Sequence, residues 1–106
     1  MPDDEVLQKA LCLLFDAAPS GSQVILFGSR ASGQARRDSD YDFLVIEPQV
    51  HNRFSEMVRL SDLLGSALIP ADVVVMSRET FQRWRSEPNS LAHRAARQGV
   101  LYDSAA

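Results

Sequence analysis

Short apolar runs bounded by turn-forming residues constrain the fold of this chain more than any other feature. They cover residues 23–27, 41–46 and 72–76, and glycine or proline residues lie close to their ends. Runs of this length that are rich in β-branched and aromatic residues are typical of buried strands. A shorter run at 100–102 directly follows Gly99. The sequence therefore predicts four strands.

Helical patterns separate these strands. Apolar residues recur at three- and four-residue steps over residues 3–17 and 51–68, which predicts helices with one apolar face. Ser77 is a good N-cap for a third helix, whose aromatic residues we expect in the core. Pro88 begins the last predicted helix, which runs through Arg97. Helices and strands thus alternate along the chain.

The length of the chain leaves room for one domain. With 106 residues, 45% of them apolar, we expect a single domain over residues 1–106. The alternation of elements predicts an α/β (α+β) fold in which helices pack against a sheet. The helix between strands 41–46 and 72–76 favours a right-handed parallel crossover for this pair. The order of the other strands stays open.

Charge and cysteine content indicate a cytoplasmic protein. The chain begins with acidic residues rather than a basic, secretory leader, and its single cysteine, Cys12, is expected to pack rather than to form a disulfide. No apolar run approaches the roughly 18 residues that a membrane span needs. The net charge of −3 favours no nucleic-acid surface. Because so small a core is marginal, a homo- or hetero-oligomer is a reasonable expectation.

A glycine–serine turn follows the first predicted strand. Gly28 permits a ligand to approach the backbone closely, and the hydroxyl of Ser29 is a potential hydrogen-bond donor to a phosphate. A Walker-type phosphate loop is excluded because Gly33 is not followed by lysine. The turn by itself is a weak signal for phosphate binding.

An acidic pair at the start of the second strand is more informative. Asp40 and Asp42 are two residues apart, so an extended backbone directs both carboxylates to one face and Tyr41 to the other. Two such carboxylates repel each other unless a cation lies between them, and their hard oxygen atoms suit Mg²⁺. If strand 72–76 lies beside this strand, Asp72 joins them. Metal ions held there would polarise an α-phosphate.

A purely structural interpretation of these acids is also available. Short polar residues at 38–40 suit a turn, and Asp72 suits the start of a strand after Pro70. The combination of a glycine–serine turn, an Asp-x-Asp pair and a third aspartate before a strand favours a site instead.

At this point the sequence resembles the minimal nucleotidyltransferase (MNT) family of the polymerase-β-like nucleotidyltransferase superfamily, antitoxin type. The residues that carry this resemblance are Gly28, Ser29, Asp40, Asp42 and Asp72. Ten residues separate the glycine–serine pair from the Asp-x-Asp pair, which is the family's Gly-Ser-x10-Asp-x-Asp signature. Residues 92–102 also resemble the family's C-terminal helix and edge strand.

The resemblance implies a mixed sheet of four to five strands and Mg²⁺-dependent transfer of a nucleoside monophosphate. AMP, or another NMP, would pass from ATP, or another NTP, to a hydroxyl group, with release of pyrophosphate. Asp40, Asp42 and Asp72 would be the catalytic and metal-binding residues. The nucleotide would contact Gly28, Ser29, Arg30 and Ser39, with Arg36 and Arg37 as weaker candidates.

Small MNT proteins resemble the antitoxin of a toxin–antitoxin pair whose toxin is a helical HEPN ribonuclease. The resemblance therefore implies a HEPN-type partner protein as acceptor, nucleotidylated on a tyrosine. One alternative is a binding module that neutralises its partner without catalysis. Another is a small-molecule nucleotidyltransferase acting with a partner subunit. An enzyme predicts that Asp40→Asn abolishes neutralisation but spares partner binding, whereas a binding module predicts that both survive.

Overall fold

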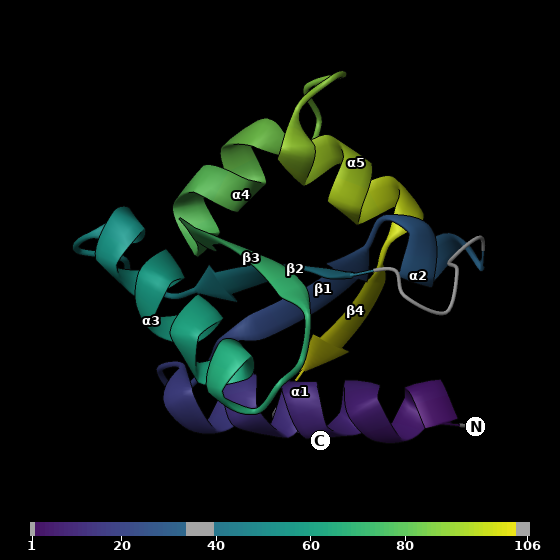
Figure 1. Cartoon of the computed structure of the whole chain (residues 1–106). Helices are drawn as coiled ribbons and strands as arrows, with labels where there is room; N and C mark the ends of the chain where they lie inside the picture. The colour runs from purple at the N-terminus through teal and green to yellow at the C-terminus, as the bar shows by residue number, and fades with distance from the viewer. Residues whose placement is uncertain (1, 34–39, 104–106) are drawn as a thin grey trace.

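The computed structural model describes residues 2–33 and 40–103, which form one sheet with helices on both faces (Figure 1). The strands are β1 (Gln23–Phe27), β2 (Tyr41–Glu47), β3 (Ala71–Ser77) and β4 (Val100–Asp103). The helices are α1 (Pro2–Ala17), α2 (Ser29–Ser32), α3 (Arg53–Ser66), α4 (Arg78–Trp84) and α5 (Leu91–Gln98). The predicted α/β (α+β) class with a mixed four-stranded sheet is confirmed.

The sheet has the strand order β3-β2-β1-β4. β1 lies between two antiparallel neighbours, β2 and β4, whereas β2 and β3 are parallel. The predicted parallel pair is therefore confirmed, and α3 provides the crossover between its strands. β4 lies at one edge of the sheet, where the resemblance to the family placed it.

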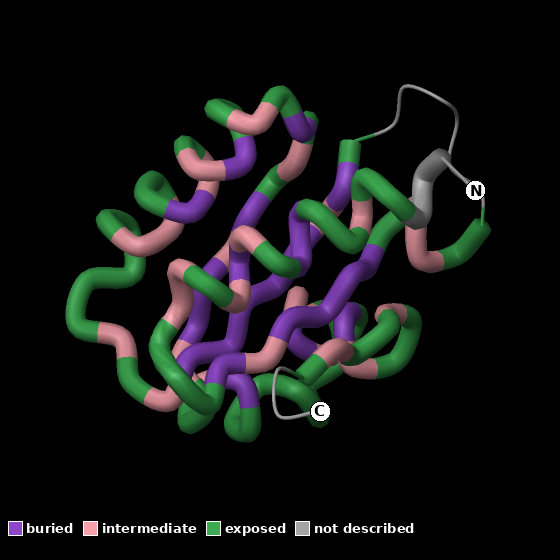
Figure 2. The backbone as a smooth tube through the Cα atoms, turned by 90° about the horizontal axis from the view of Figure 1, so that it is seen from below, coloured by how far each residue is buried: buried purple, intermediate pink, exposed green. Residues whose placement is uncertain are grey.

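Apolar side chains on the two faces of the sheet belong to two separate cores. One core packs α1 and α3 against the face that carries Phe43, and the other packs α4 and α5 against the face that carries Leu44. Figure 2 shows buried backbone running through the middle of the molecule, and helices on which buried residues alternate with exposed ones. Burial on both faces explains why the strands are nearly continuous apolar runs rather than alternating ones.

Two helix ends differ from the sequence prediction, because local hydrogen bonds and turns determine where a helix begins and ends. The last helix begins at Leu91 instead of Pro88, because the Ser90 hydroxyl accepts a hydrogen bond from the backbone N–H of His93 at 3.0 Å. α3 ends at Ser66, before the predicted end, and the chain turns through a left-handed residue, Leu68. The short helix α2 lies in a segment predicted as a polar loop.

Two expectations about the core are wrong. Phe81 is buried as predicted, but Trp84, in the last turn of α4, is 48% exposed. Cys12 is exposed on α1 rather than packed, and the cysteine is free. No helix in residues 2–33 and 40–103 is long and apolar enough to cross a membrane.

Candidate active site

The two strand aspartates lie side by side in the sheet. Asp42 of β2 and Asp72 of β3 are partners in the parallel register. Because side chains alternate along a strand, both belong to the face covered by α4 and α5, together with Leu44 and Met76. The sheet therefore brings together two carboxylates that are thirty residues apart in sequence.

Electrostatic interactions join Asp40 to this pair. The pKa of Asp42 is raised above its usual value, first by burial and then by the negative charges of Asp72 and Asp40. The positive charge of Arg94 on α5 acts in the opposite direction. Asp40 and Asp72 are exposed, whereas Asp42 is half-buried. Of the three carboxylates, the register thus brings Asp42 and Asp72 together, and the charge of Asp40 acts on Asp42.

Gly28 leaves room for the carboxylate of Asp42. Phe27 at the end of β1 pairs with Asp42, so the next residue lies against the aspartate side chain. A Cβ on Gly28 would collide with Oδ2 of Asp42 and would lie 3.1 Å from its Cγ. Gly28 also has a φ of 74°, a conformation that residues with a side chain rarely adopt. Two independent constraints thus require glycine at this position.

The donor chemistry of the three aspartates fits a divalent cation. Their side chains supply hard oxygen ligands, which Mg²⁺ prefers, and their mutual repulsion is the kind that a cation relieves. Within the described part of the chain, however, no group of three or more potential ligands is already arranged to hold a metal ion. The carboxylates are thus neighbours in the fold without forming a closed metal cage.

The predicted nucleotide-binding residues occupy different places. Ser29 begins α2, directly after the glycine, and is half-buried. The guanidinium of Arg30 lies 4.4 Å from the ring centroid of Tyr41, whose side chain belongs to the core on the opposite face of the sheet from Asp42. Ser39, like Arg36 and Arg37, lies outside the described residues. The structure thus places Arg30 away from the acidic face, whereas Ser29 directly follows Gly28, whose Cβ position meets the carboxylate of Asp42.

Sequence reasoning missed Arg94. In the sequence this residue reads as a charge on the solvated side of a helix, because Ala92 and Ala95 supply the apolar face of α5. Its effect on Asp42 arises only when α5 packs over the sheet, so no local pattern could reveal it.

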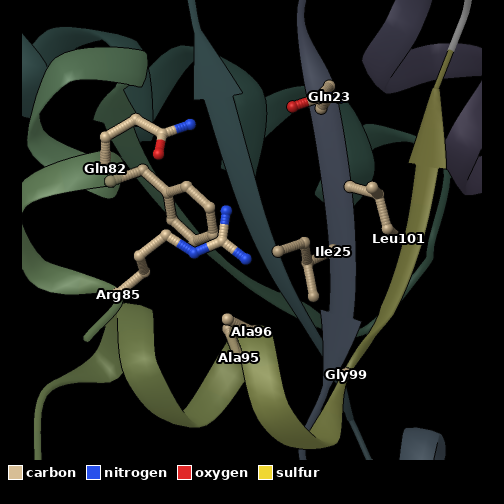
Figure 3. A pocket seen from close by; sticks show the side chains of 9 residues that line it. Gln23, Ile25, Gln82, Arg85, Ala95, Ala96, Gly99 and Leu101 are labelled. Atoms are coloured by element: carbon tan, nitrogen blue, oxygen red, sulfur yellow. The ribbon is translucent and has the colours of Figure 1, made fainter. Parts of the chain in front are cut away.

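In the described part of the chain, α5 borders an inner and an outer cavity, and no aspartate is among the residues that line them. The inner one, of about 240 Å³, lies between α4, α5 and β1 and is shown in Figure 3. Its lining includes Arg85, whose guanidinium lies 5.3 Å from the ring centroid of Phe81. The outer one, of about 460 Å³, is lined by polar residues of α5 and of the turn before it. The outer cavity shares Arg94 with the surroundings of Asp42.

Comparison with known proteins identifies relatives of this chain. Residues 6–96 match the family described as the nucleotidyltransferase domain. The structure is similar to a toxin–antitoxin crystal structure with AMP-PNP, at 29% sequence identity and a TM-score of 0.64, covering 89% of this chain and 69% of the other.

Two further toxin–antitoxin structures are similar. For a mutant of the toxin–antitoxin MntA-HpeT, identity is 26%, the TM-score is 0.62, and coverage is 89% of this chain and 69% of the other. For the complex of tri-AMPylated Shewanella oneidensis HEPN toxin with MNT antitoxin, identity is 21%, the TM-score is 0.62, and coverage is 92% of this chain and 69% of the other. At this identity the likeness shows the fold alone. No curated protein matches the sequence.

Proposed function

Because this chain belongs to the nucleotidyltransferase domain family, we propose that it transfers AMP from Mg²⁺-bound ATP to a hydroxyl group of a partner protein. The observation that carries the proposal is the pairing of Asp42 with Asp72 beside Gly28, which has no Cβ. A similar structure, 29% identical, contains AMP-PNP, which supports a nucleoside triphosphate as the donor.

Each part of the site has a separate task. Asp40, Asp42 and Asp72 would hold Mg²⁺ through carboxylate oxygens. When bound, the metal supplies positive charge that offsets the negative charge of the phosphates. Gly28 lets the phosphate chain approach the backbone, and Ser29 donates a hydrogen bond from its hydroxyl to a phosphate oxygen.

The transfer itself is a displacement at the α-phosphorus. The acceptor oxygen forms a bond to this phosphorus while the bond to the oxygen that bridges the α- and β-phosphates breaks, and pyrophosphate leaves. Asp72, the exposed member of the Asp42–Asp72 pair, accepts the proton of the acceptor hydroxyl. Asp42 stays beside Gly28 and keeps the donor in position.

We assign the acceptor to a HEPN-type toxin, so that the chain acts as an antitoxin. Structures at 29% and 26% identity are toxin–antitoxin complexes, which supports a protein partner over a small molecule. Transfer of AMP to a tyrosine of the toxin would inactivate it. Mg²⁺ and ATP are then the only small molecules the reaction needs, and a cytoplasmic location would supply both.

The test measures which phosphate of ATP is transferred. The purified chain is incubated with Mg²⁺, a lysate of its source cells, and ATP labelled at either the α- or the γ-phosphate. We expect only the α-label to appear on a protein band. Asp42→Asn and Asp40→Asn should abolish the labelling, because each removes a carboxylate charge from the site.

Asp62→Asn is the matched control, because it makes the same change at an exposed position on α3, outside the site. It should label as the wild type does. Transfer of the γ-label would indicate a kinase and contradict the proposal. If neither label moves while a partner co-purifies with the wild type and Asp42→Asn alike, the chain is a binding module.

A further inference from the structure

Three side chains form a stack on the face of the sheet that α1 and α3 cover. The guanidinium of Arg30 lies 4.4 Å from the centroid of the Tyr41 ring. That ring is nearly parallel to the ring of Phe43, with 5.9 Å between the centroids and an interplanar angle of 5°. Tyr41 is 3% exposed, and Phe43 is fully buried. A cation over the electronegative face of a buried ring is a stabilising contact, so Arg30 is attached to the core through Tyr41.

The Arg30 end of this stack belongs to the turn that follows β1. Arg30 is the second residue of α2, which begins at Ser29, directly after Gly28 (Figure 1). The backbone N–H groups of Ala31 and Ser32 both donate to the carbonyl oxygen of Gly28, each at 3.2 Å. The turn and α2 therefore form one hydrogen-bonded unit, so a contact made by Arg30 also restrains Gly28.

The Tyr41 end of the stack belongs to the acidic strand. Tyr41 lies between Asp40 and Asp42 in the sequence, and its backbone N–H donates to the carbonyl oxygen of Pro70 at 3.0 Å. Because successive side chains of a strand point to opposite faces, burial of the Tyr41 ring directs Asp42 to the other face. The same residue thus anchors Arg30 on one face and sets the direction of the Asp42 carboxylate on the other.

The turn at Gly28 lies beyond the last pair of the ladder between β1 and β2. That ladder ends where Phe27 pairs with Asp42. α2 has no buried residue, although Ala31 is partly buried against the core. The turn nevertheless approaches β2 closely, because a Cβ on Gly28 would lie 3.1 Å from Cγ of Asp42. The contact of Arg30 with Tyr41 therefore restrains a separation that the ladder does not fix.

We propose that Arg30 is a positioning residue for nucleotidyl transfer, which acts through Tyr41 to hold the Gly28–Ser29 turn at a fixed separation from Asp42. This inference rests on the proposed function, in which the turn would contact the phosphates and the aspartates would hold Mg²⁺. The separation of turn and aspartates then determines where the α-phosphorus lies when ATP binds. A misplacement of about 1 Å can lower a rate about a hundredfold, so a contact outside the site can control the reaction.

A positioning role agrees better with the structure than a direct contact between Arg30 and a phosphate. The ring of Tyr41 belongs to the core under α1 and α3, whereas Asp42 and Leu44 belong to the face under α4 and α5. The guanidinium over Tyr41 is therefore on the opposite face of the sheet from the Asp42 carboxylate. To contact a phosphate beside Asp42, Arg30 would have to give up its contact with the ring.

Rates of α-label transfer test this inference. Initial rates are measured over a range of Mg²⁺-ATP concentrations, with a fixed amount of source-cell lysate, for Arg30→Met, Arg30→Lys, Tyr41→Leu and Tyr41→Phe. We expect Arg30→Met to lower the maximal rate about tenfold or more at a nearly unchanged KM, because the donor still binds but is misplaced. Arg30→Lys and Tyr41→Phe keep a cation over an aromatic ring, so both should retain most of the rate. Tyr41→Leu should lose at least as much as Arg30→Met.

The double variant Arg30→Met/Tyr41→Leu measures whether the two residues act through one contact. Because removal of either side chain breaks the same contact, the double variant should be no slower than the slower single variant. Losses that multiply in the double variant would overturn the inference. A higher KM at an unchanged maximal rate in Arg30→Met would also overturn it, in favour of a direct phosphate contact.

Arg85→Met is the matched control, because Arg85 makes an equivalent contact with the ring of Phe81, at 5.3 Å, on the other face of the sheet. It should transfer the label as the wild type does, and circular dichroism should show that every variant is folded. Equal rates in Arg30→Met and Arg85→Met would overturn the inference.

Hydrogen exchange separates this inference from the proposed function. NMR measures the exchange rates of the Ala31 and Ser32 amide hydrogens, which bond to the carbonyl oxygen of Gly28. We expect exchange to be roughly threefold faster or more in Arg30→Met and unchanged in Arg85→Met, because loss of the ring contact releases α2. Faster exchange, with a wild type that transfers no label, would refute nucleotidyl transfer and support the role of Arg30 in holding the turn. Equal transfer by the wild type and Arg30→Met would refute only that role, and no transfer with unchanged exchange would overturn both.

Discussion

A buried carboxyl group at the end of β2 should make the stability of this protein fall as the pH rises. Glu47 is only 2% exposed, and its Oε2 atom has no hydrogen-bond partner among the described residues. Burial, followed by its hydrogen bond to Glu56 and the charge of that residue, raises the pKa of Glu47 to about 8. Glu56 accepts hydrogen bonds from Arg59 and from Glu47, and these two bonds lower the pKa of Glu56 to about 2. The two carboxyl groups therefore share one proton at neutral pH.

The magnitude follows from the protons that each state binds. The pKa of an unperturbed glutamate is 4.5, so between this pH and about 8 the folded chain keeps a proton that the unfolded chain has lost. Over this range the free energy of unfolding should decrease by about 1.4 kcal/mol per pH unit, or about 5 kcal/mol in total. Glu56 has the opposite effect on the free energy of unfolding, because its pKa is lower in the folded chain. The stability that it contributes is fully present above pH 4.5 and is lost as the pH falls through about 2.

Glu47→Gln removes the titration but keeps a hydrogen-bond donor for Glu56. We expect this variant to gain stability relative to the wild type as the pH rises from 5 to 9, because its amide cannot lose a proton. Urea unfolding followed by circular dichroism at pH 5, 7 and 9 measures the difference between the two proteins. Glu79→Gln, at a side chain that is 85% exposed, is the control and should show no such change. A difference between Glu47→Gln and wild type that stays constant over this pH range would refute the reasoning.

Three further predictions concern the site and its supports. Gly28→Ala should reduce nucleotidyl transfer about a hundredfold, because its Cβ would displace the Asp42 carboxylate. Gly33→Ala has the same backbone strain and open space around its Cβ, so equal losses in both variants, measured by labelling rates, would argue against the collision. Asp72→Asn should lower the pKa of Asp42 by removing a neighbouring negative charge. NMR titration of the carboxyl groups measures this change, and an unchanged pKa of Asp42 would contradict the prediction. Gly99→Ala should cost about 1–3 kcal/mol of unfolding free energy, because its Cβ would meet the backbone of β1; thermal and urea melts matching those of the wild type would contradict this close packing.

Helix ends and exposure were the least predictable features of the fold. Periodicity predicted strand 23–27 at its observed bounds, because that segment is buried on both faces and reads as an apolar run. It did not predict that α5 begins at Leu91, after the cap Ser90, rather than at Pro88, because capping depends on one hydrogen bond and not on a pattern. Trp84 was predicted in the core from its spacing, but α4 ends with that side chain at the surface.

The acidic pair and the glycine–serine turn could be recognised in the sequence because their spacing is covalent. Two residues along an extended chain necessarily direct Asp40 and Asp42 to one face, and a glycine directly after a strand permits close approach. These local rules hold whatever the rest of the chain does. The sequence by itself therefore determined the local arrangement of the glycine–serine turn and of the Asp40–Asp42 pair.

Only the tertiary structure decided what stands beside that pair. Asp72 meets Asp42 because the crossover through α3 sets a parallel register between strands that are distant in sequence. Arg94 acts on Asp42 because α5 packs across the sheet, while Arg30 lies over Tyr41 instead of the acidic face. Contacts of this kind depend on how whole elements pack, and no spacing along the chain encodes them.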